Sequence, residues 1–263
     1  MKIYLTFDVE EWVLPEDYKV ESNHNNNLEF ADKGCMKLLD LLQKHEITST
    51  FFITGYFAER KKELVKEIAS CGHEVASHGY KHVSFSSLDK KGAEDSIFSS
   101  KHILSRMAGK QIKGFRAPNF SFSPEMFQAL LKSGYRYDSS VHPAIVPGHY
   151  YNVRACLEPY YPLKDKKLIE IPLSVFPGLR MPLSWVWMRN IGTWLTAYGV
   201  SRNLKKRDAA LYFHTWEFVQ VPRVKGIPFY IRRNTGERFL RMFDKFISGF
   251  EDCEFGRLEE FVK

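Results

Sequence analysis

Two histidines, His78 and His82, lie four residues apart in the segment HGYKH. On a helical turn, this separation places both imidazoles on one side, close enough to share a metal cation. Two histidines bind a cation poorly by themselves, so we expect a carboxylate as the third ligand. The alternative is a pair of surface histidines, or of histidines satisfied by neighbouring groups.

The second candidate group is acidic and directly follows a short apolar run. Asp8, Val9, Glu10 and Glu11 come after the residues IYLTF. Successive side chains of a strand point to opposite faces, so Asp8 and Glu10 share a face that Val9 cannot join. One carboxylate could bind the cation while the other acts as a general base toward water. Glu11 takes the ligand role if the strand ends early, and a solvated acidic turn is the non-catalytic alternative.

Two further side chains lie where strands are expected to end. Arg116 follows a short apolar segment, and an arginine there can hold a carboxylate bidentately and keep it ionised. His214 ends another apolar segment, close to Trp216, and could be a general acid tuned by a carboxylate such as Asp138. The alternatives are a structural ion pair for Arg116 and a satisfied core histidine for His214.

Predicted strands and helices alternate along the chain and carry these residues. Strands are predicted over residues 2–7, 47–53, 73–77, 112–116, 135–140, 168–175 and 209–214. Helical patterns lie between them, including residues 59–70 and 88–107. This alternation indicates an α/β fold with a parallel sheet, which we expect to close into a barrel of seven or eight strands. In such barrels functional groups sit at the carboxyl ends of the strands, where all of the candidate residues fall.

Composition and charge bound the class of protein. The chain has 263 residues, of which 44% are hydrophobic and 26% charged, as in an ordinary globular protein. No repeat or low-complexity linker divides it, so we expect a single domain over residues 1–263. The net charge is +7, but the basic residues form no stripe or motif, so no nucleic-acid partner is predicted.

Cysteine usage and hydropathy indicate the compartment. Four cysteines show no paired spacing, which fits a reducing environment: Cys35, Cys71, Cys156 and Cys253. The start of the chain does not resemble a signal peptide, and no apolar run approaches the ~18 residues of a membrane span. The best candidate, residues 182–198, is interrupted by Arg189 and Asn190. We expect a cytoplasmic protein, peripheral to the inner membrane face.

In this order, the segments resemble the five motifs of the polysaccharide deacetylase family, the NodB-homology or carbohydrate esterase 4 type. The counterparts are Thr6-Phe7-Asp8, the segment 77–82, Phe115-Arg116-Ala117-Pro118, Tyr137-Asp138-Ser139-Ser140 and Phe213-His214-Thr215-Trp216. The Asp-Val-Glu start and the final His-x-Trp-Glu resemble a subgroup encoded with exopolysaccharide assembly systems.

The resemblance implies a distorted (β/α) barrel, often of seven strands, that holds a divalent cation, commonly zinc. The ligands would be Glu10, His78 and His82. The implied reaction removes the acetyl group from an N-acetylated amino sugar of a polysaccharide or glycan precursor. Asp8 would be the base, and Arg116 would orient it.

By the same resemblance, His214 would protonate the leaving amine, with Asp138 keeping it charged. The backbone N–H of Asn119 would stabilise the oxyanion, and Trp216 would help to bind the substrate. The implied partner is a carbohydrate, lipid-linked or polymeric. Two alternatives stay open: another C–N hydrolase, such as a sugar deformylase or a cyclic-amide hydrolase, and a non-catalytic carbohydrate-binding barrel.

Overall fold

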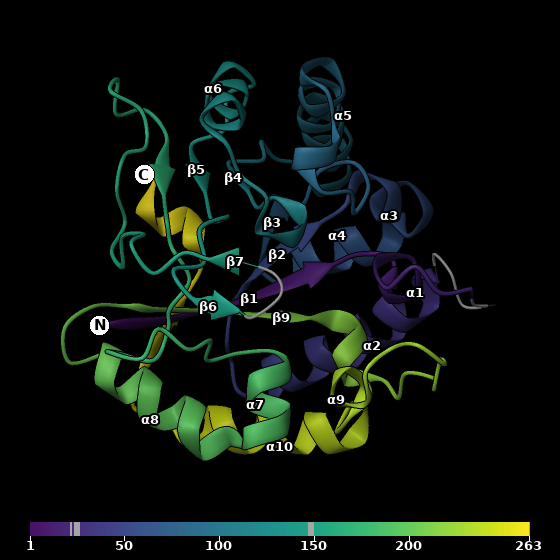
Figure 1. The fold of residues 1–263 in the computed structure, drawn as a ribbon, viewed down its shortest axis with the longest axis vertical. Helices are drawn as coiled ribbons and strands as arrows, with labels where there is room; N and C mark the ends of the chain where they lie inside the picture. Colours follow the sequence, from purple (N-terminus) through teal and green to yellow (C-terminus); the bar gives the residue numbers. More distant parts are fainter. Residues whose placement is uncertain (22, 24–26, 147–149, 263) are drawn as a thin grey trace.

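A curled sheet of parallel strands is the centre of the protein, which is seen here as a computed structural model that describes residues 1–21, 23, 27–146 and 150–262 (Figure 1). Within these residues, eight strands form the sheet: β1 (Lys2–Val9), β2 (Thr50–Ile53), β3 (Glu74–Ser77), β4 (Gly114–Phe115), β5 (Tyr137–Asp138), β8 (Ile169–Glu170), β9 (Ala209–His214) and β10 (Glu254–Gly256). A separate antiparallel pair is formed by β6 (Ile145–Val146) and β7 (Tyr150–Tyr151).

Strand β1 joins the first and last parts of the chain. One edge pairs with β9 over residues 3–8. The other edge is shared, because residues 2–4 pair with β10 and residues 6–9 pair with β2. From β2 the sheet continues through β3, β4 and β5 to β8.

After β8, the chain returns to β9, and Ser174 forms hydrogen bonds to this strand. Ser174 donates its backbone N–H to the carbonyl of Ala210 at 2.8 Å, and its hydroxyl accepts from the Ala210 N–H at 3.0 Å. The result is a barrel-like single-domain α/β fold, and all seven predicted strands are present in it. β10 was not predicted, since three residues that pair only with the start of β1 give no recognisable pattern.

Three of the predicted strands, β4, β5 and β8, are reduced to two residues each. β4 and β5 pair only through residues 114–115 and 137–138. Gly114 allows this close approach, because a Cβ there would lie 2.0 Å from the ring of Tyr137. A side chain at position 114 would therefore separate the two strands that carry the third and fourth motifs.

Helices surround the sheet (Figure 1). They are α1 (Leu14–Asp17), α2 (Leu28–Lys44), α3 (Gly55–Arg60), α4 (Lys62–Ser70), α5 (Lys90–Ala108), α6 (Pro124–Lys132), α7 (Val186–Ile191), α8 (Thr193–Asn203), α9 (Phe229–Arg232) and α10 (Glu237–Ser248). The predicted helix over residues 59–70 is thus two helices that meet at Lys61. In the described part of the chain, no helix is both long and apolar enough to cross a membrane.

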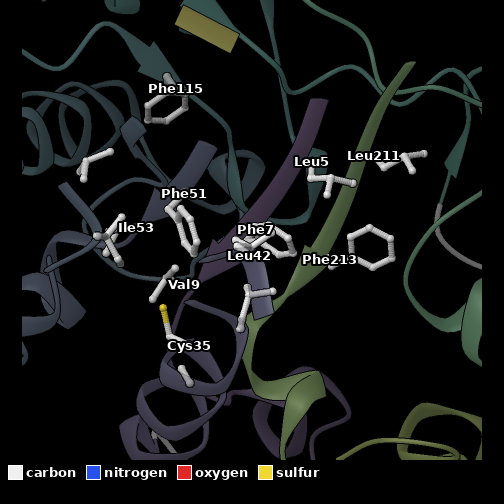
Figure 2. Packing of buried hydrophobic residues seen from close by; sticks show 14 of the residues in the cluster. Leu5, Phe7, Val9, Cys35, Leu42, Phe51, Ile53, Phe115, Leu211 and Phe213 are labelled. Atoms are coloured by element: carbon white, nitrogen blue, oxygen red, sulfur yellow. The ribbon is translucent and has the colours of Figure 1, made fainter. Parts of the chain in front are cut away.

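The alternation in β1 separates two layers. Leu5, Phe7 and Val9 face the helices, where Cys35 and Leu42 of α2 pack against them (Figure 2). Residues at even positions, from Tyr4 to Asp8, face the inside of the barrel instead. The strand pattern therefore points the carboxylate of Asp8 inward and keeps the apolar packing outside.

The far end of the barrel is covered by the chain terminus. In η4 (Leu258–Phe261), a short 3₁₀ helix, the Leu258 N–H donates to the Thr50 hydroxyl at 2.9 Å and the Glu259 N–H donates to Glu74 at 2.9 Å. Glu74 is 1% exposed, and burial raises its pKa to about 7. The last strand and this helix therefore close the barrel against a buried carboxyl group.

Candidate metal site and active-site cleft

A cleft of about 640 Å³ opens at the carboxyl ends of the strands. Asp8 lies in β1 and Glu10 just past its end, His78 and His82 follow β3, and His214 ends β9. Because the strands are parallel, with Asp8 directly opposite His214, their ends deliver all five side chains to one place.

Three of these side chains form a compact group of potential metal ligands. One ligand atom each of Glu10, His78 and His82 lies within 4.8 Å of the others. The Glu10 Oε2 atom is 3.2 Å from the His78 Nε2 and 3.1 Å from the His82 Nε2. That oxygen is buried and has no partner of good hydrogen-bond geometry in the described part of the chain. A carboxylate oxygen facing two imidazole nitrogens is a donor set that suits a divalent cation such as zinc.

Neighbouring groups fix the orientation of these ligands. The His78 Nδ1–H donates a hydrogen bond to the Arg116 carbonyl at 2.8 Å. This leaves the Nε2 atom, with its lone pair, to bind a cation. Of the two carboxylates left open by the sequence, the structure places Glu10 with the histidines. Glu11 instead accepts a hydrogen bond from the Thr54 hydroxyl at 2.9 Å.

The protonation states also suit a metal site. Burial by itself would raise the pKa of Glu10, but the surrounding imidazoles, with His82 first, bring it below its ordinary value. Burial lowers the pKa of His82. An ionised carboxylate and a neutral imidazole are the forms in which these side chains bind metals.

Asp8 is held by a buried arginine. The Arg116 Nη1 donates to the Asp8 Oδ1 and to the Thr6 hydroxyl, both at 2.8 Å. Its Nε and Nη2 donate to the carbonyl and hydroxyl of Ser139 at 3.0 and 3.1 Å. The expected bidentate contact is thus a single hydrogen bond to Asp8. The Nε and Nη2 groups, which bind Ser139, hold the guanidinium against the segment that follows β5.

His214 has a carboxylate partner of its own. Its Nδ1 lies 3.3 Å from the Glu217 Oε1, and its Nε2 lies 3.8 Å from the Glu10 Oε1. Glu217, in η3 (Thr215–Phe218), is itself paired with buried Arg189 of α7. Burial on its own lowers the pKa of His214, but the Glu217 hydrogen bond and the carboxylates of Glu10, Glu217 and Asp8 raise it above its ordinary value.

Asp138 does not pair with His214 as expected, because other groups in its own strand region satisfy it. Its carboxylate accepts hydrogen bonds from the backbone N–H and hydroxyl of Ser140 at 3.2 and 2.8 Å, and it shares a hydrogen bond with Glu170. Burial raises the pKa of both carboxyl groups. The Ser140 hydroxyl also accepts from the Ala117 N–H at 2.8 Å, so Asp138 braces the backbone just after Arg116.

The two residues expected to contact substrate both line the cleft. Asn119 lies in η2 (Pro118–Phe120) with a left-handed backbone, at φ 55°. Trp216 is only 1% exposed; its ring stacks on His214, and its indole N–H lies 3.4 Å from the Glu10 Oε1. The contacts that Trp216 makes are with the site's own side chains, and its contact with a substrate stays a prediction.

The sequence did not lead us to predict that Glu217 and Arg189 form the ion pair next to His214. Glu217 stands three residues after His214 and also accepts the His214 backbone N–H at 2.9 Å. This capping-box spacing at the start of a short helix is the signal that could have found it. Arg189 gives no local signal, because it lies 28 residues from Glu217 and meets it only in the folded chain.

Comparison with protein families identifies two sequence models that together match most of the chain. The sequence model described as polysaccharide deacetylase matches residues 1–137, more than half of the chain. A second model, a domain of unknown function called DUF3473, matches residues 139–263. The chain belongs to the polysaccharide deacetylase family. The metal-ligand candidates and Arg116 lie in the first match, whereas His214 and Glu217 lie in the second.

Similar proteins include a peptidoglycan deacetylase from Helicobacter pylori, 35% identical over 111 residues. That match covers 42% of this chain and 38% of the relative, so the chain spans well under half of its length. A crystal structure from Mycobacterium smegmatis, called a polysaccharide deacetylase, has a TM-score of 0.68 at 20% identity and covers 99% of this chain and 88% of that one. The Puue allantoinase has a TM-score of 0.63 at 15% identity, covering 98% and 88%. Proteins named for different reactions thus share this fold, and the site must distinguish them.

Proposed function

We propose that this protein is a metal-dependent hydrolase that removes the N-acetyl group from an amino sugar of a polysaccharide or glycan precursor. The observation that carries the proposal is the convergence of three groups on one cleft: the Glu10, His78 and His82 cluster, the Asp8–Arg116 pair, and His214. Membership of the polysaccharide deacetylase family and the named activity of the Helicobacter pylori relative support the same reaction.

Zinc is the cation that the donor set favours, since two imidazole nitrogens and one carboxylate oxygen are common zinc ligands. Glu10, His78 and His82 would hold it. When bound, such a cation supplies a Lewis acid that polarises the amide carbonyl and makes water more acidic.

The chain's own residues would then move the protons. Asp8, oriented by its hydrogen bond from Arg116, takes a proton from the attacking water. His214, whose pKa is raised, donates a proton to the leaving amine. The backbone N–H of Asn119, at the cleft wall, is proposed to stabilise the oxyanion. Glu217 takes the place expected for Asp138 in holding the charge of His214.

The substrate is proposed to be a glycan carrying N-acetylated amino sugars, polymeric or lipid-linked, including an exopolysaccharide precursor. A cytoplasmic location with peripheral membrane contact is part of this proposal. The four cysteines support it, because all of them are free thiols.

The direct test is acetate release from N-acetylglucosamine oligomers, measured before and after treatment with EDTA and again after zinc is restored. We expect release that EDTA abolishes and zinc restores. Formate release from the matching N-formyl sugar, with none from the N-acetyl sugar, would make the protein a deformylase. Sugar binding that is unaffected by EDTA, with no hydrolysis of either compound, would make it a non-catalytic barrel.

A further inference from the structure

The net positive charge of the chain is concentrated in one segment. Residues 186–233 contain nine Lys and Arg but only two Asp and Glu, a difference equal to the +7 of the whole chain. The two acidic residues are both engaged within the fold: Asp208 accepts the backbone N–H of Lys2, and Glu217 is buried against Arg189. Outside this segment the positive and negative charges balance. Such an asymmetry indicates attraction to an anionic partner.

The same segment carries five exposed large apolar side chains: Tyr198 in the middle of α8, and four others at the adjoining ends of α7 and α8 and on α9. Trp194 is 66% exposed, Phe229 60%, Tyr230 48% and Ile191 42%. We call these four residues the aromatic shelf. They lie at the end of α7, the start of α8 and on α9, which border one edge of the molecule (Figure 1).

Hydrogen bonds connect α7 to α9, two of the three helices of the shelf. The Asn190 side chain of α7 donates to the Tyr230 carbonyl of α9 at 3.0 Å. Arg189 donates to the carbonyls of Ile231 and Arg233 from the same helix turn. These bonds hold α9 against α7, so Ile191, Phe229 and Tyr230 are displayed by a fixed framework.

Basic side chains flank the shelf. Arg223, Lys225 and Arg233 are exposed on either side of α9. The Arg232 guanidinium lies 4.9 Å from the centroid of the Phe229 ring. Exposed tryptophan, phenylalanine and tyrosine interleaved with arginine and lysine are typical of surfaces that sit in the headgroup region of a bilayer.

The shelf adjoins the cleft. Trp185 and Trp187, at the start of α7, line the cleft, and α7 ends at Ile191 of the shelf. On the other side, Tyr18 lines the cleft and is hydrogen-bonded to Tyr230. A surface that engages the shelf would therefore lie next to the cleft mouth.

We propose that the aromatic shelf and its basic flank dock the protein on an anionic lipid bilayer. This inference rests on the proposed function and narrows its substrate, since it brings the cleft to amino sugars that are carried on membrane lipids. A soluble acidic polymer would be attracted by the same charges, but it would not require a tryptophan and a phenylalanine that protrude from helix ends. The bilayer accounts for both the charge and the apolar side chains.

Sedimentation with lipid vesicles tests the proposal. The full chain is mixed with vesicles of phosphatidylcholine alone, or of phosphatidylcholine with phosphatidylglycerol, at low and at high salt. We expect binding to the anionic vesicles that weakens as salt rises. The double variant Trp194→Ser with Phe229→Ser should bind about tenfold more weakly or worse, because each change removes an apolar group from the interface.

Phe98→Ser is the matched control, since Phe98 of α5 is also 66% exposed but lies outside the segment. It should bind vesicles like the unmodified chain. The proposal is overturned if the double variant binds vesicles as well as this control, or if the chain binds a soluble acidic polysaccharide but not the vesicles. It is also overturned if the double variant changes a dimer into a monomer in sedimentation equilibrium, because the shelf would then be a contact between copies.

Turnover of a short soluble N-acetylglucosamine oligomer separates this proposal from the proposed function. The double variant should hydrolyse that oligomer at the rate of the unmodified chain, since neither residue lines the cleft. Vesicle binding without any turnover would contradict the proposed hydrolase activity but support the docking surface. Turnover without vesicle binding would support the hydrolase activity but contradict the docking surface.

Discussion

At the scale of single residues, the site depends on side chains that hold other side chains. His78 is oriented by the Arg116 carbonyl, while the guanidinium of the same arginine holds Asp8. One residue therefore connects a metal-ligand candidate to the proposed base. The base and the ligands can be separated by mutation, because Asp8 is not part of the cluster formed by Glu10 and the two histidines.

Asp8→Asn should keep the bound metal but lose turnover by about 10²–10⁴-fold, because it removes a general base and no ligand. Acetate release and metal content are measured on the same preparation. Asp95→Asn, an exposed carboxylate on α5, is the control and should retain activity. A variant at Asp8 that turns over normally would show that another group is the base.

Glu217→Gln should lower the pKa of His214, because the Glu217 hydrogen bond and charge raise it. If His214 must be protonated to act as the acid, activity falls as pH rises through its pKa. The alkaline limb of the kcat/KM profile should therefore move to lower pH in the variant. Thermal melting checks that the chain still folds with Arg189 unpaired. An unmoved alkaline limb in a folded variant would contradict this role.

How far the sequence predicts the site differs from residue to residue. Strand alternation was enough to predict that Asp8 and Glu10 face the same side, because both lie in or directly after one short strand. The partner of His214 could not be chosen in this way, because Asp138 and Glu217 are both acidic residues in segments that resemble the family's motifs, and only the fold shows which of them is near His214. Asp138 turns to Ser140 and Glu170 on its own side of the barrel.

At the scale of elements, the packing of α2 on η3 controls the position of Trp216 and Glu217. Gly34 is the contact point, because a Cβ there would lie 1.9 Å from the Thr215 carbonyl oxygen. Gly34→Ala should cost about 1–3 kcal/mol of unfolding free energy, as overpacked sites do. Urea denaturation measures the loss, with Asp40→Ala on the exposed face of α2 as the control. Equal stability of the two variants would mean that α2 can shift freely.

The buried carboxyl of β3 gives the barrel a pH-dependent stability. Burial raises the pKa of Glu74 from 4.5 to about 7, so the folded state keeps a proton that the unfolded state loses in this range. Its contribution is complete below about pH 4.5 and is lost as the pH rises through about 7, on the order of 3 kcal/mol in total. Glu74→Gln should flatten this fall in urea denaturation between about pH 5 and about pH 8. An identical slope in the variant would exclude Glu74 as the source.

The elements themselves were largely predictable, because apolar runs bounded by polar turns define each of the seven strands. Their lengths were not, since β4, β5 and β8 pair over only two residues each. Apolar residues beyond the paired ones, such as Ile171 and Leu173, pack inside the barrel without being part of a strand. The sequence pattern does not distinguish a buried apolar residue of this kind from one in a paired strand.

At the scale of the whole molecule, the two family matches do not correspond to two separable units. β1, in the first match, pairs along one edge with β9 and at its start with β10, both from the second. We therefore propose one domain over residues 1–263. A chain ending at residue 137 should fail to fold, and the complete chain should unfold in a single transition by circular dichroism and fluorescence. Two separate transitions would contradict this.

The proposed reaction depends on Glu10, His78 and His82 holding a single divalent cation. Elemental analysis after loading with zinc and desalting tests it most directly, on the unmodified chain, Asp8→Asn and His78→Ala. We expect zinc in near-equal amount to protein for the first two and little for His78→Ala, with all three folded by circular dichroism. A folded His78→Ala that retains as much zinc as the unmodified chain would contradict it.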